Sequence, residues 1–378
     1  MNILRFLTAG ESHGPCLTVI IEGLPAGLPI EPSEINAFLK RRQGGYGRGK
    51  RMEIEEDRCE ITGGVRSGKT LGSPISIKIE NKDWPNWKDK WDSSEPILVP
   101  RPGHADLPGA IKYGHSDIRN VLERSSARET AVRCVVGSIA KRFLSIFEID
   151  ILGYLLAIGR IKTEKRPESL NEIIDSPFFC QDKEKEVEMK KEVDTAEQEG
   201  DSLGGIFEVR ATGLPPGLGS YVHWDRRLDA KISFALMSIP AIKGVEIGLG
   251  FSGAERRGST FHDEILYDEE KGFYRKTNNA GGIEGGISNG EPIIVRCAMK
   301  PIPTLRNPLS SCHIITKEKA PAPIIRADIS AVPAASVVGE AMLAIVLADS
   351  FMERFGSDNL FLIKERFFRE KEKNFLPF

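Results

Sequence analysis

The sequence predicts an α/β fold in which helices and strands form a sandwich within a single large domain. Two observations favour this fold. Segments with apolar residues at helical spacing alternate along the chain with short β-rich runs, and glycine- and proline-rich turns separate them. The chain has 378 residues, of which 40% are hydrophobic and 28% charged, enough for a large core. That length allows one large domain or two to three units of about 150 residues.

The first part of the chain predicts two strands and a helix. Residues 17–21 and 75–79 are short apolar runs rich in β-branched side chains, which predicts strands. Between them, apolar residues recur at helical spacing after Pro32 and stop at the glycine pair that begins with Gly44. This pattern predicts one helix between the two strands.

The clearest helix is predicted to begin near residue 126. Ser126 and Glu129 stand three residues apart, which is the spacing of a capping box at a helix start. One apolar stripe follows it, formed by Val132, Val135, Val136, Ile139 and Phe143. The position of these residues predicts a helix with one face buried in the core.

The remaining elements alternate in the same way. Residues 206–211 and 292–298 predict strands, and residues 225–237 and 334–355 predict helices. Residues 182–199 are dense in Glu, Lys and Asp, which predicts either a solvated helix or a mobile arm. In the tail after Gly356, phenylalanines alternate with charged residues, and the pattern leaves open whether they dock on the domain or on a neighbouring subunit.

Composition excludes several classes of protein. Net charge is -2, so the basic surplus of a dedicated nucleic-acid binder is missing. The six cysteines form no CxxC pair and no Cys/His cluster, which argues against structural zinc and disulfides and favours reduced thiols. The amino terminus has no signal-peptide pattern, and the apolar stretch 341–348 is too short to span a bilayer. We therefore expect a soluble cytoplasmic protein without a metal site or a membrane or nucleic-acid partner.

Two histidines lie in tight, glycine-containing turns. His13 stands within GESHGP and His104 within RPGHAD, beside Arg101. An accessible imidazole in such a turn suits a proton donor near neutral pH. A single histidine in a turn is more often structural than catalytic, so these two positions favour acid catalysis only weakly by themselves.

Residues 40–51, KRRQGGYGRGKR, form a basic loop without an acidic residue. Guanidinium groups match carboxylate and phosphate oxygens, so this loop is expected to attract a multiply charged anion. A solvated basic loop and an RNA-binding segment are the alternatives. Only Tyr46 offers a ring on which a base could stack, and an acidic run follows at once, which argues against RNA.

Three further segments suit phosphate or a flat ligand. The segment 124–129, RSSARE, combines two hydroxyls and two arginines with a helix start, where unpaired N–H groups attract anions. The glycine-rich segment 278–290 allows close approach of a ligand, although a hairpin is the commoner explanation. KPIPT at 300–304 and RAD at 326–328 add two cations and a carboxylate. Together the segments predict a pocket for a small polyanion and a phosphorylated cofactor.

Seven motifs in order resemble the chorismate synthase family: GESHGP, RRQGGYGR, RPGHAD, RSSARET, MSIPAIKGVEIG, NAGGIEGGIS and RADISAVPAASVVGEAM. The resemblance covers about residues 3–356 and fades in 182–199 and in the tail. It implies a β-α-β sandwich, one catalytic domain over 1–356 with a charged variable insert at 182–199, a tail at 357–378, and a homotetramer.

The resemblance also implies a reaction. It is the anti-1,4-elimination of phosphate from 5-enolpyruvylshikimate-3-phosphate to give chorismate, the last step of the shikimate pathway, with reduced FMN and no net redox change. The cofactor would supply the difficult chemistry while the protein orients and neutralises. NADPH is a candidate reductant of the flavin, and whether this chain uses it stays open. A flavin reductase or other oxidoreductase is a further alternative.

Residue by residue, the resemblance assigns proton transfer to His13, which would protonate the departing phosphate, and to His104, which would protonate the reduced flavin. Asp328 would act as the base, with Ser12 and Ser125 as a relay. The expected substrate-binding residues are Arg42, Arg48, Arg51, Arg101, Arg128 and Arg326. The expected cofactor-binding residues are Arg124, Ser125, Ser126, Ala241, Gly285, Lys300, Pro301, Ile302, Pro303, Thr304 and Arg326. Pro240 and Ala327 depart from the family pattern and put side-chain contacts at those points in doubt.

Overall fold

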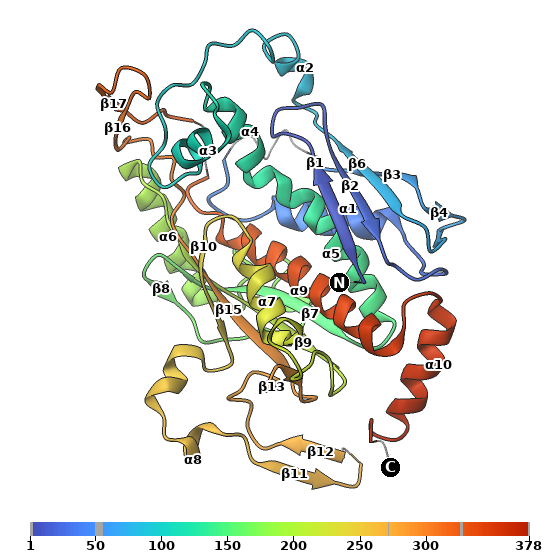
Figure 1. Ribbon diagram of the computed structural model, residues 1–378. Helices are drawn as coiled ribbons and strands as arrows, with labels where there is room; N and C mark the ends of the chain where they lie inside the picture. Colours follow the sequence, from blue (N-terminus) through green and yellow to red (C-terminus); the bar gives the residue numbers. More distant parts are fainter. Residues whose placement is uncertain (1–2, 50–55, 271, 326–327, 377–378) are drawn as a thin grey trace.

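Two antiparallel sheets enclose a layer of helices in the computed structural model, which describes residues 3–49, 56–270, 272–325 and 328–376 (Figure 1). One sheet has four strands and the other five. The helices between them are α1 (Pro32–Gln43), α5 (Thr130–Ser145) and α9 (Val332–Phe355). The architecture is a β-α-β sandwich, as the sequence predicted.

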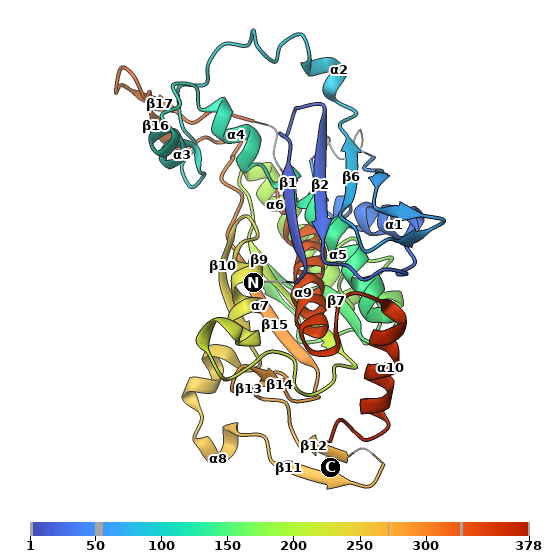
Figure 2. The same cartoon turned by 45° about the vertical axis from the view of Figure 1, so that its right-hand side comes forward.

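The four-stranded sheet is built from the amino-terminal part of the chain. In spatial order its strands are β1 (Arg5–Ala9), β2 (Cys16–Glu22), β6 (Ile75–Glu80) and β3 (Cys59–Gly63), three of which are labelled side by side in Figure 2. Alternate side chains of a strand point to one face, and here Leu17 pairs with Ile79 and Val19 with Ile77, all buried. That apolar face covers α1 and α5.

The five-stranded sheet covers the other side of the helices. Its strands, in spatial order, are β10 (Ile242–Ile247), β15 (Ile293–Met299), β9 (Gly205–Thr212), β7 (Asp150–Ile158) and β8 (Ile161–Lys162). All residues of β7 except Asp150 are buried, because the helices cover one face of the strand and loops and α6 cover the other. A strand buried on both faces loses the polar alternation that makes strands recognisable in a sequence.

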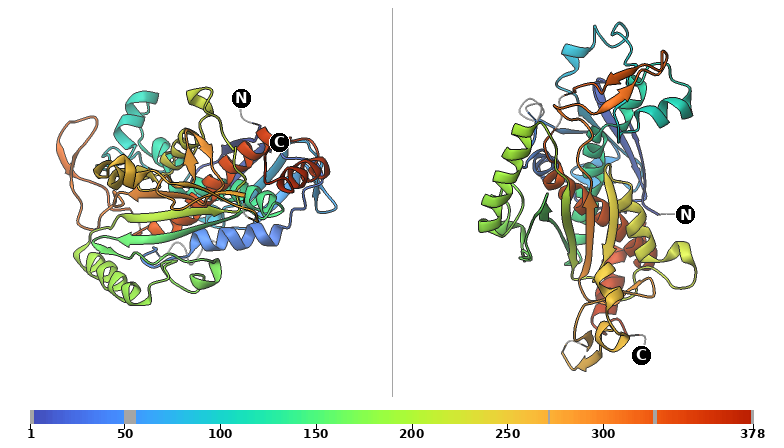
Figure 3. Two further views of the ribbon diagram at one scale, coloured as in Figure 1. Left: turned by 90° about the horizontal axis from the view of Figure 1, so that it is seen from below. Right: turned by 90° about the vertical axis from the view of Figure 1, so that its left-hand side faces the viewer.

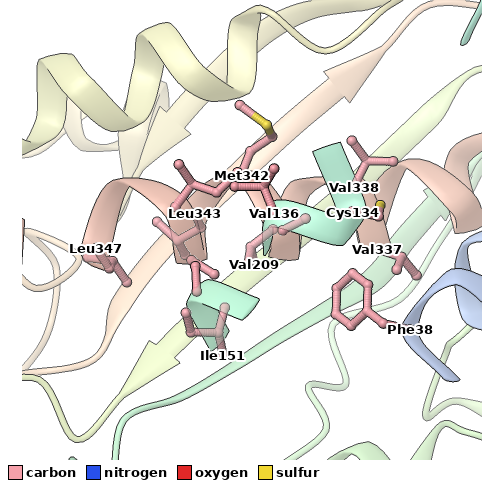
Figure 4. Packing of buried hydrophobic residues seen from close by; sticks show 14 of the residues in the cluster. Phe38, Cys134, Val136, Ile151, Val209, Val337, Val338, Met342, Leu343 and Leu347 are labelled. Carbon is pink, nitrogen blue, oxygen red and sulfur yellow. The ribbon is translucent and has the colours of Figure 1, made fainter. Parts of the chain in front are cut away.

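Helix α9 is the centre of the core. Figure 4 shows Val337, Val338, Met342 and Leu343 of this helix packed among side chains from α1, α5, β7 and β9. By length and composition α9 could cross a membrane, but its apolar window is entirely buried inside the protein. A helix that is apolar all round is expected where other elements surround it.

Two glycines allow the central elements to approach closely. A Cβ atom at Gly137 of α5 would overlap the Cα and Cβ atoms of Ala341 on α9. A Cβ at Gly153 of β7 would overlap the backbone carbonyl oxygen of Ser336, one turn before Glu340 on the same helix. The packing of α9 therefore depends on the absence of side chains at these two positions.

A buried ion network ties the layers together. The carboxylate of Glu340, which is 0% exposed, accepts hydrogen bonds from Arg41 at 2.9 and 3.2 Å and from the Lys141 amine at 2.7 Å. The backbone N–H of Gly153 donates to the same carboxylate at 3.0 Å. Burial alone would raise the pKa of Glu340, but the two cations outweigh it and lower the pKa to about 2.

The remaining elements lie around this sandwich. The helices are α2 (Trp84–Trp87), α3 (Asp106–Tyr113), α4 (Arg119–Ser125), α6 (Lys183–Glu199), α7 (Leu228–Met237), α8 (Gly258–Phe261) and α10 (Leu360–Lys371), and the 3-10 helices are η2 (Ala127–Glu129), η3 (Leu170–Glu172), η4 (Trp224–Arg226) and η5 (Gly250–Glu255). The short strand pairs are β4 (Val65–Arg66) with β5 (Lys69–Thr70), β11 (Ile265–Asp268) with β12 (Gly272–Arg275), β13 (Ile283–Glu284) with β14 (Ile287–Ser288), and β16 (Ser310–Cys312) with β17 (Lys319–Pro321). Figure 3 shows α3, α4 and the β16–β17 hairpin at one end of the molecule and the β11–β12 hairpin at the opposite end.

All four predicted helices and all four predicted strands are present. The capping box at Ser126 is only half formed: Ser126 accepts from the Arg128 N–H and caps η2, whereas the Glu129 carboxylate binds Arg133 and Thr8. The charged segment is a helix, α6, whose Met189 and Val193 are buried.

The carboxyl-terminal tail also forms a helix, α10, and it docks on its own chain. Phe367 of α10 is buried against Phe147, Phe351 and Phe355. The tail therefore belongs to the same hydrophobic core, which the sequence pattern had left open.

Candidate functional site

His13 is held by a buried carboxylate. Its Nδ1 lies 2.7 Å from Oε1 of Glu123, and its backbone N–H donates to Oε2 of the same residue at 2.8 Å. Glu123 belongs to α4 and has a side chain only 6% exposed. The glycine-containing turn places the imidazole at the end of β1, where α4 approaches it. The result is a carboxylate–imidazole pair with a fixed ring orientation.

The turn around His13 is anchored on both sides. The Asn81 amide donates to the carbonyl oxygens of Ser12 and Gly14 at 3.1 and 2.9 Å. The Ser126 hydroxyl donates to the Ser12 hydroxyl at 3.1 Å, which connects the turn to the start of η2. The ring of Trp87 covers the imidazole of His13, with 4.0 Å between ring centroids.

Two predicted substrate arginines share one buried carboxylate. Asp57, 4% exposed, accepts from Arg128 at 2.5 Å and from Arg42 at 3.5 Å. Arg42 also donates to the Thr130 hydroxyl and to the Ala127 carbonyl oxygen. Burial lowers the pKa of Arg42, and the neighbouring Arg128 lowers it further while Asp57 opposes this. Both guanidinium groups are therefore held rigidly beneath the start of α5.

Arg48 and Asp328 form the next pair. Nη1 of Arg48 lies 2.8 Å from Oδ2 of Asp328, and the Gly49 N–H donates to Oδ1 at 2.7 Å. The positive charge of Arg48 is close enough to lower the pKa of Arg42. The proposed base is therefore joined to the arginine-rich loop rather than standing apart from it.

His104 is the second carboxylate–imidazole pair. Its Nδ1 lies 2.6 Å from Oδ1 of Asp106, which is 1% exposed. Arg101 donates to both oxygens of Asp106, at 2.8 and 3.0 Å, and to the Thr304 hydroxyl at 3.3 Å. Burial would raise the pKa of Asp106, but the hydrogen bonds from His104 and Arg101 hold it well below its usual range.

The segment 300–304 lies against the His104 turn. The Lys300 amine donates to the Gly103 carbonyl oxygen, and the Lys300 N–H donates to Ala241 at 3.0 Å. A Cβ atom on Gly103 would lie 3.6 Å from Pro303. Burial and the nearby Lys243 lower the pKa of Lys300. Four of the predicted cofactor positions, Ala241, Lys300, Pro303 and Thr304, are thus neighbours of His104.

Backbone hydrogen bonds connect the two histidine pairs. Ile329, next to Asp328, donates to Gly47 at 2.7 Å and accepts from Leu203 at 2.8 Å. The preceding residue, Ser202, donates its hydroxyl to the carbonyl oxygen of Ile302 at 2.6 Å. Contacts and chain neighbours therefore link His13 through Ser126 to Arg42, and Arg48 through Asp328 to Thr304 and His104, while Arg42 and Arg48 are close enough for their charges to interact.

Other predicted residues are placed differently. Arg124 donates to the Thr8 and Gly10 carbonyl oxygens, and Ser125 donates to the Val121 carbonyl oxygen within its own helix. Both lie beside the His13 turn. Arg51 and Arg326 lie outside the residues that the structure describes.

Gly285 is not beside the other predicted cofactor residues in this chain. It occupies the turn of the β13–β14 hairpin with φ of 59°, next to the start of α7, where Leu228 donates to Gly286. Ala241 follows the opposite end of α7. A ten-residue helix is about 15 Å long, so Gly285 and Ala241 of the same chain are separated by a distance of about that length or more. The glycine-rich segment 278–290 contains the β13–β14 hairpin, which was the commoner of the two explanations of its sequence.

Several residues of the site were not expected from the sequence. Asp57 was noted only as part of an acidic run, and Glu123, Asn81 and Trp87 were not considered. Glu123 directly precedes the RSSARE segment, and Asp106 stands two residues after His104. A search for carboxylates next to the histidine motifs could have found Asp106, but not Glu123, which lies 110 positions from His13.

The RNA-binding alternative finds no support in the loop that suggested it. Arg41 binds Glu340, Arg42 binds Asp57 and Arg48 binds Asp328, and their side chains are between 6% and 12% exposed. A nucleic-acid backbone requires cations that reach the surface. In the described part of the loop these three guanidinium groups face inward.

Comparisons with known proteins agree with the arrangement. The sequence profile of a family described as chorismate synthase matches residues 4–352. A chorismate synthase of Geotalea uraniireducens is 56% identical, and the match covers 97% of this chain and 98% of that protein. One from Aquifex aeolicus is 55% identical, with 97% of each chain covered. A crystal structure of a chorismate synthase superimposes with a TM-score of 0.81 and 47% identity over 98% of both chains.

Proposed function

The chain belongs to the chorismate synthase family, and from this premise we propose how its site acts. The reaction is the elimination of phosphate from 5-enolpyruvylshikimate-3-phosphate, which yields chorismate. The observation that carries the assignment of the site is the connected series of cations, hydroxyls and two carboxylate–imidazole pairs between His13 and His104. A trianionic substrate requires such a lining, because each of its charged groups loses water on binding.

We assign the first proton transfer to His13. As the bond between the ring carbon and the phosphate oxygen breaks, the phosphate leaves with the electron pair, and His13 donates a proton to it. The pair with Glu123 supports this role because a carboxylate on Nδ1 stabilises the protonated ring before the transfer. The cationic lining of Arg48 and Arg128 would stabilise the charge that grows on the leaving group.

Reduced FMN is the proposed cofactor. Donors near both histidine turns fit its phosphate and ring edges: the Lys300 amine and Thr304 hydroxyl beside the His104 turn, and the Ser126 hydroxyl beside the His13 turn. When bound, this group would supply electron density that assists departure of the allylic phosphate. His104 would hold a proton at this end of the site, and Asp328 would offer a proton-accepting carboxylate positioned by Arg48 and Gly49.

Four further proposals concern the oligomeric state, the compartment, the extent of the domain and the reductant of the flavin. We propose that the enzyme works as a homotetramer in the cytoplasm, because its family relationship supports both. The domain is proposed to extend over 1–356. NADPH is a candidate reductant for the flavin, and oxidation of NADPH by the protein with FMN and without substrate would reveal it.

The decisive experiment is an anaerobic incubation of the whole chain with substrate and photoreduced FMN. Phosphate release and the absorbance of chorismate should rise together in a one-to-one ratio. Oxidised FMN serves as the matched control and should give no product. Folded protein that releases no phosphate with reduced FMN would overturn the proposed function.

A further inference from the structure

We infer that Glu123 is a positioning residue that fixes which nitrogen of His13 transfers the proton. The inference deepens the proposed function and rests on it. Glu123 is not one of the residues assigned above to substrate or cofactor binding. It would act on the reaction only through His13.

Glu123 contacts His13 through both of its carboxylate oxygens. One carboxylate oxygen accepts from the backbone N–H at 2.8 Å and the other faces Nδ1 at 2.7 Å. The backbone oxygen of Glu123 also accepts from the N–H of Ser12 at 3.0 Å. Main chain and side chain of a single α4 residue thus hold two consecutive residues of the turn, and rotation of the imidazole would break its contact with the carboxylate.

The residues around His13 and Glu123 limit the access of water to this pair. Trp87 covers the imidazole with a 34° tilt, and its indole N–H donates to Asp83 at 2.9 Å, which fixes the covering ring. The side chains of Glu123 and His13 are 6% and 14% exposed. Exclusion of water strengthens the attraction between a carboxylate and a protonated ring.

This geometry has a chemical consequence. With Nδ1 bound to the carboxylate, the proton on Nδ1 is retained, and Nε2 on the other side of the ring becomes the atom that gives a proton to the leaving phosphate oxygen. After the transfer the ring is neutral and still donates from Nδ1 to Glu123. Without the carboxylate charge, the protonated ring is less stable and the neutral ring can carry its hydrogen on either nitrogen.

The pair at His104 differs in one respect. Asp106 accepts from Arg101 as well as from His104, so a guanidinium already offsets its charge. The Glu123 carboxylate oxygens both face His13. Two other charged groups lie nearby: Glu11 packs over Gly14, and Arg124 is directed to the carbonyl oxygens of Thr8 and Gly10. Among these described groups, Glu123 is the one whose carboxylate bonds directly to the ring of His13.

The test is a double-mutant cycle of Glu123→Gln and His13→Asn. Glutamine keeps the size and an accepting oxygen but removes the charge. We expect Glu123→Gln to lower kcat by about tenfold to a hundredfold with KM changed less than about twofold, as for other partners that orient a functional imidazole. In the His13→Asn background the same substitution should lower kcat no further, because its target is gone. Single-turnover phosphate release with enzyme in excess makes the slow rates measurable.

Glu95→Gln is the matched control, because this exposed glutamate undergoes the same change of charge and size. Its kcat should equal that of the unaltered chain, and thermal unfolding should show that all variants are folded. Full kcat in Glu123→Gln, or an equal loss of kcat in both backgrounds, would overturn the inference while leaving the proposed function standing. No phosphate release by the unaltered chain would instead remove the function and the inference together.

Discussion

The hydroxyl of Tyr46 donates a 2.6 Å hydrogen bond to the Asp194 carboxylate, which joins α6 to the loop that carries Arg48. The Lys190 amine lies 5.2 Å from the centre of the same ring, and Gly47 packs against Val193 so tightly that a Cβ would lie 3.0 Å from its methyl group. The charged helix is thus a support for the basic loop rather than a detached arm.

Removal of this bond should weaken substrate binding. Tyr46→Phe is expected to raise KM by about fivefold, since a typical hydrogen bond contributes about 1 kcal/mol, while kcat changes less. The hydrogen bond to Asp194, followed by burial, raises the pKa of Tyr46 to about 12, so the hydroxyl remains a donor in the working range. The rise in KM should therefore be the same at pH 6 and pH 9. Glu188→Gln, on the exposed side of α6, should leave KM unchanged.

Both site histidines should be needed for turnover. His13→Ala and His104→Ala are each expected to slow phosphate release by about a hundredfold or more, because a proton donor is lost, while substrate binding measured by equilibrium dialysis persists. His223→Ala is the control and should keep the normal rate of phosphate release. His223 also pairs with a carboxylate, that of Asp225, at 2.6 Å, but both side chains are more than half exposed. A near-normal rate in either site variant would remove that residue from the mechanism.

The network around Glu340 should make stability depend on acidity. The pKa of Glu340 is about 2 in the folded protein, against about 4.3 in an unfolded chain, so its contribution is complete above about pH 4.3 and is lost as pH falls toward 2. At pH 7, Glu340→Gln should lower the free energy of unfolding by about 3–5 kcal/mol, because Arg41 and Lys141 lose their partner. Urea unfolding at pH 7 and pH 3 measures the difference, which should be smaller at pH 3. An equal difference at both values would contradict this account.

The contact between α5 and α9 should not tolerate a methyl group. Gly137→Ala places a Cβ on Ala341, so the helices must separate, and the free energy of unfolding should fall by about 1–3 kcal/mol. Gly244→Ala is the comparison, because a Cβ there would meet only Ala298 at an ordinary 3.5 Å. Denaturant unfolding should show a clearly lower free energy of unfolding for Gly137→Ala than for Gly244→Ala. Equal values would mean that the contact between α5 and α9 can adjust to the added methyl group.

The elements that the sequence predicted well carry a clear period of apolar residues. The alternation in β2 and β6 matches strands with one buried face, and the stripe from Val132 to Phe143 identified α5 although most of that helix is buried. Strand β7 escaped prediction because both of its faces are buried, which removes the alternation. The helical form of 182–199 was one of two alternatives, and the buried Met189 and Val193 on one side explain why it is ordered.

The site was predictable in its cations and histidines but not in their partners. Motifs such as GESHGP and RPGHAD identify the two site histidines because the glycines around them are local signals. Glu123 approaches His13 across 110 positions of the chain, and Asp57 meets Arg128 across 71. Such pairings depend on how the layers stack, which no local pattern records.

The position of α9 in the chain has a consequence for biosynthesis. Helix α9 begins at Val332 and is synthesised well after α1 and α5, which pack against it and are complete by Ser145. At about 5 to 20 residues per second, the nascent chain keeps that apolar seam open for on the order of 10 to 40 s. Packing of α5 against α9 therefore has to wait for this interval, in which chaperones that shield exposed apolar surface can act. A stop codon just before Val332 would leave α1 and α5 without the helix against which both of them pack.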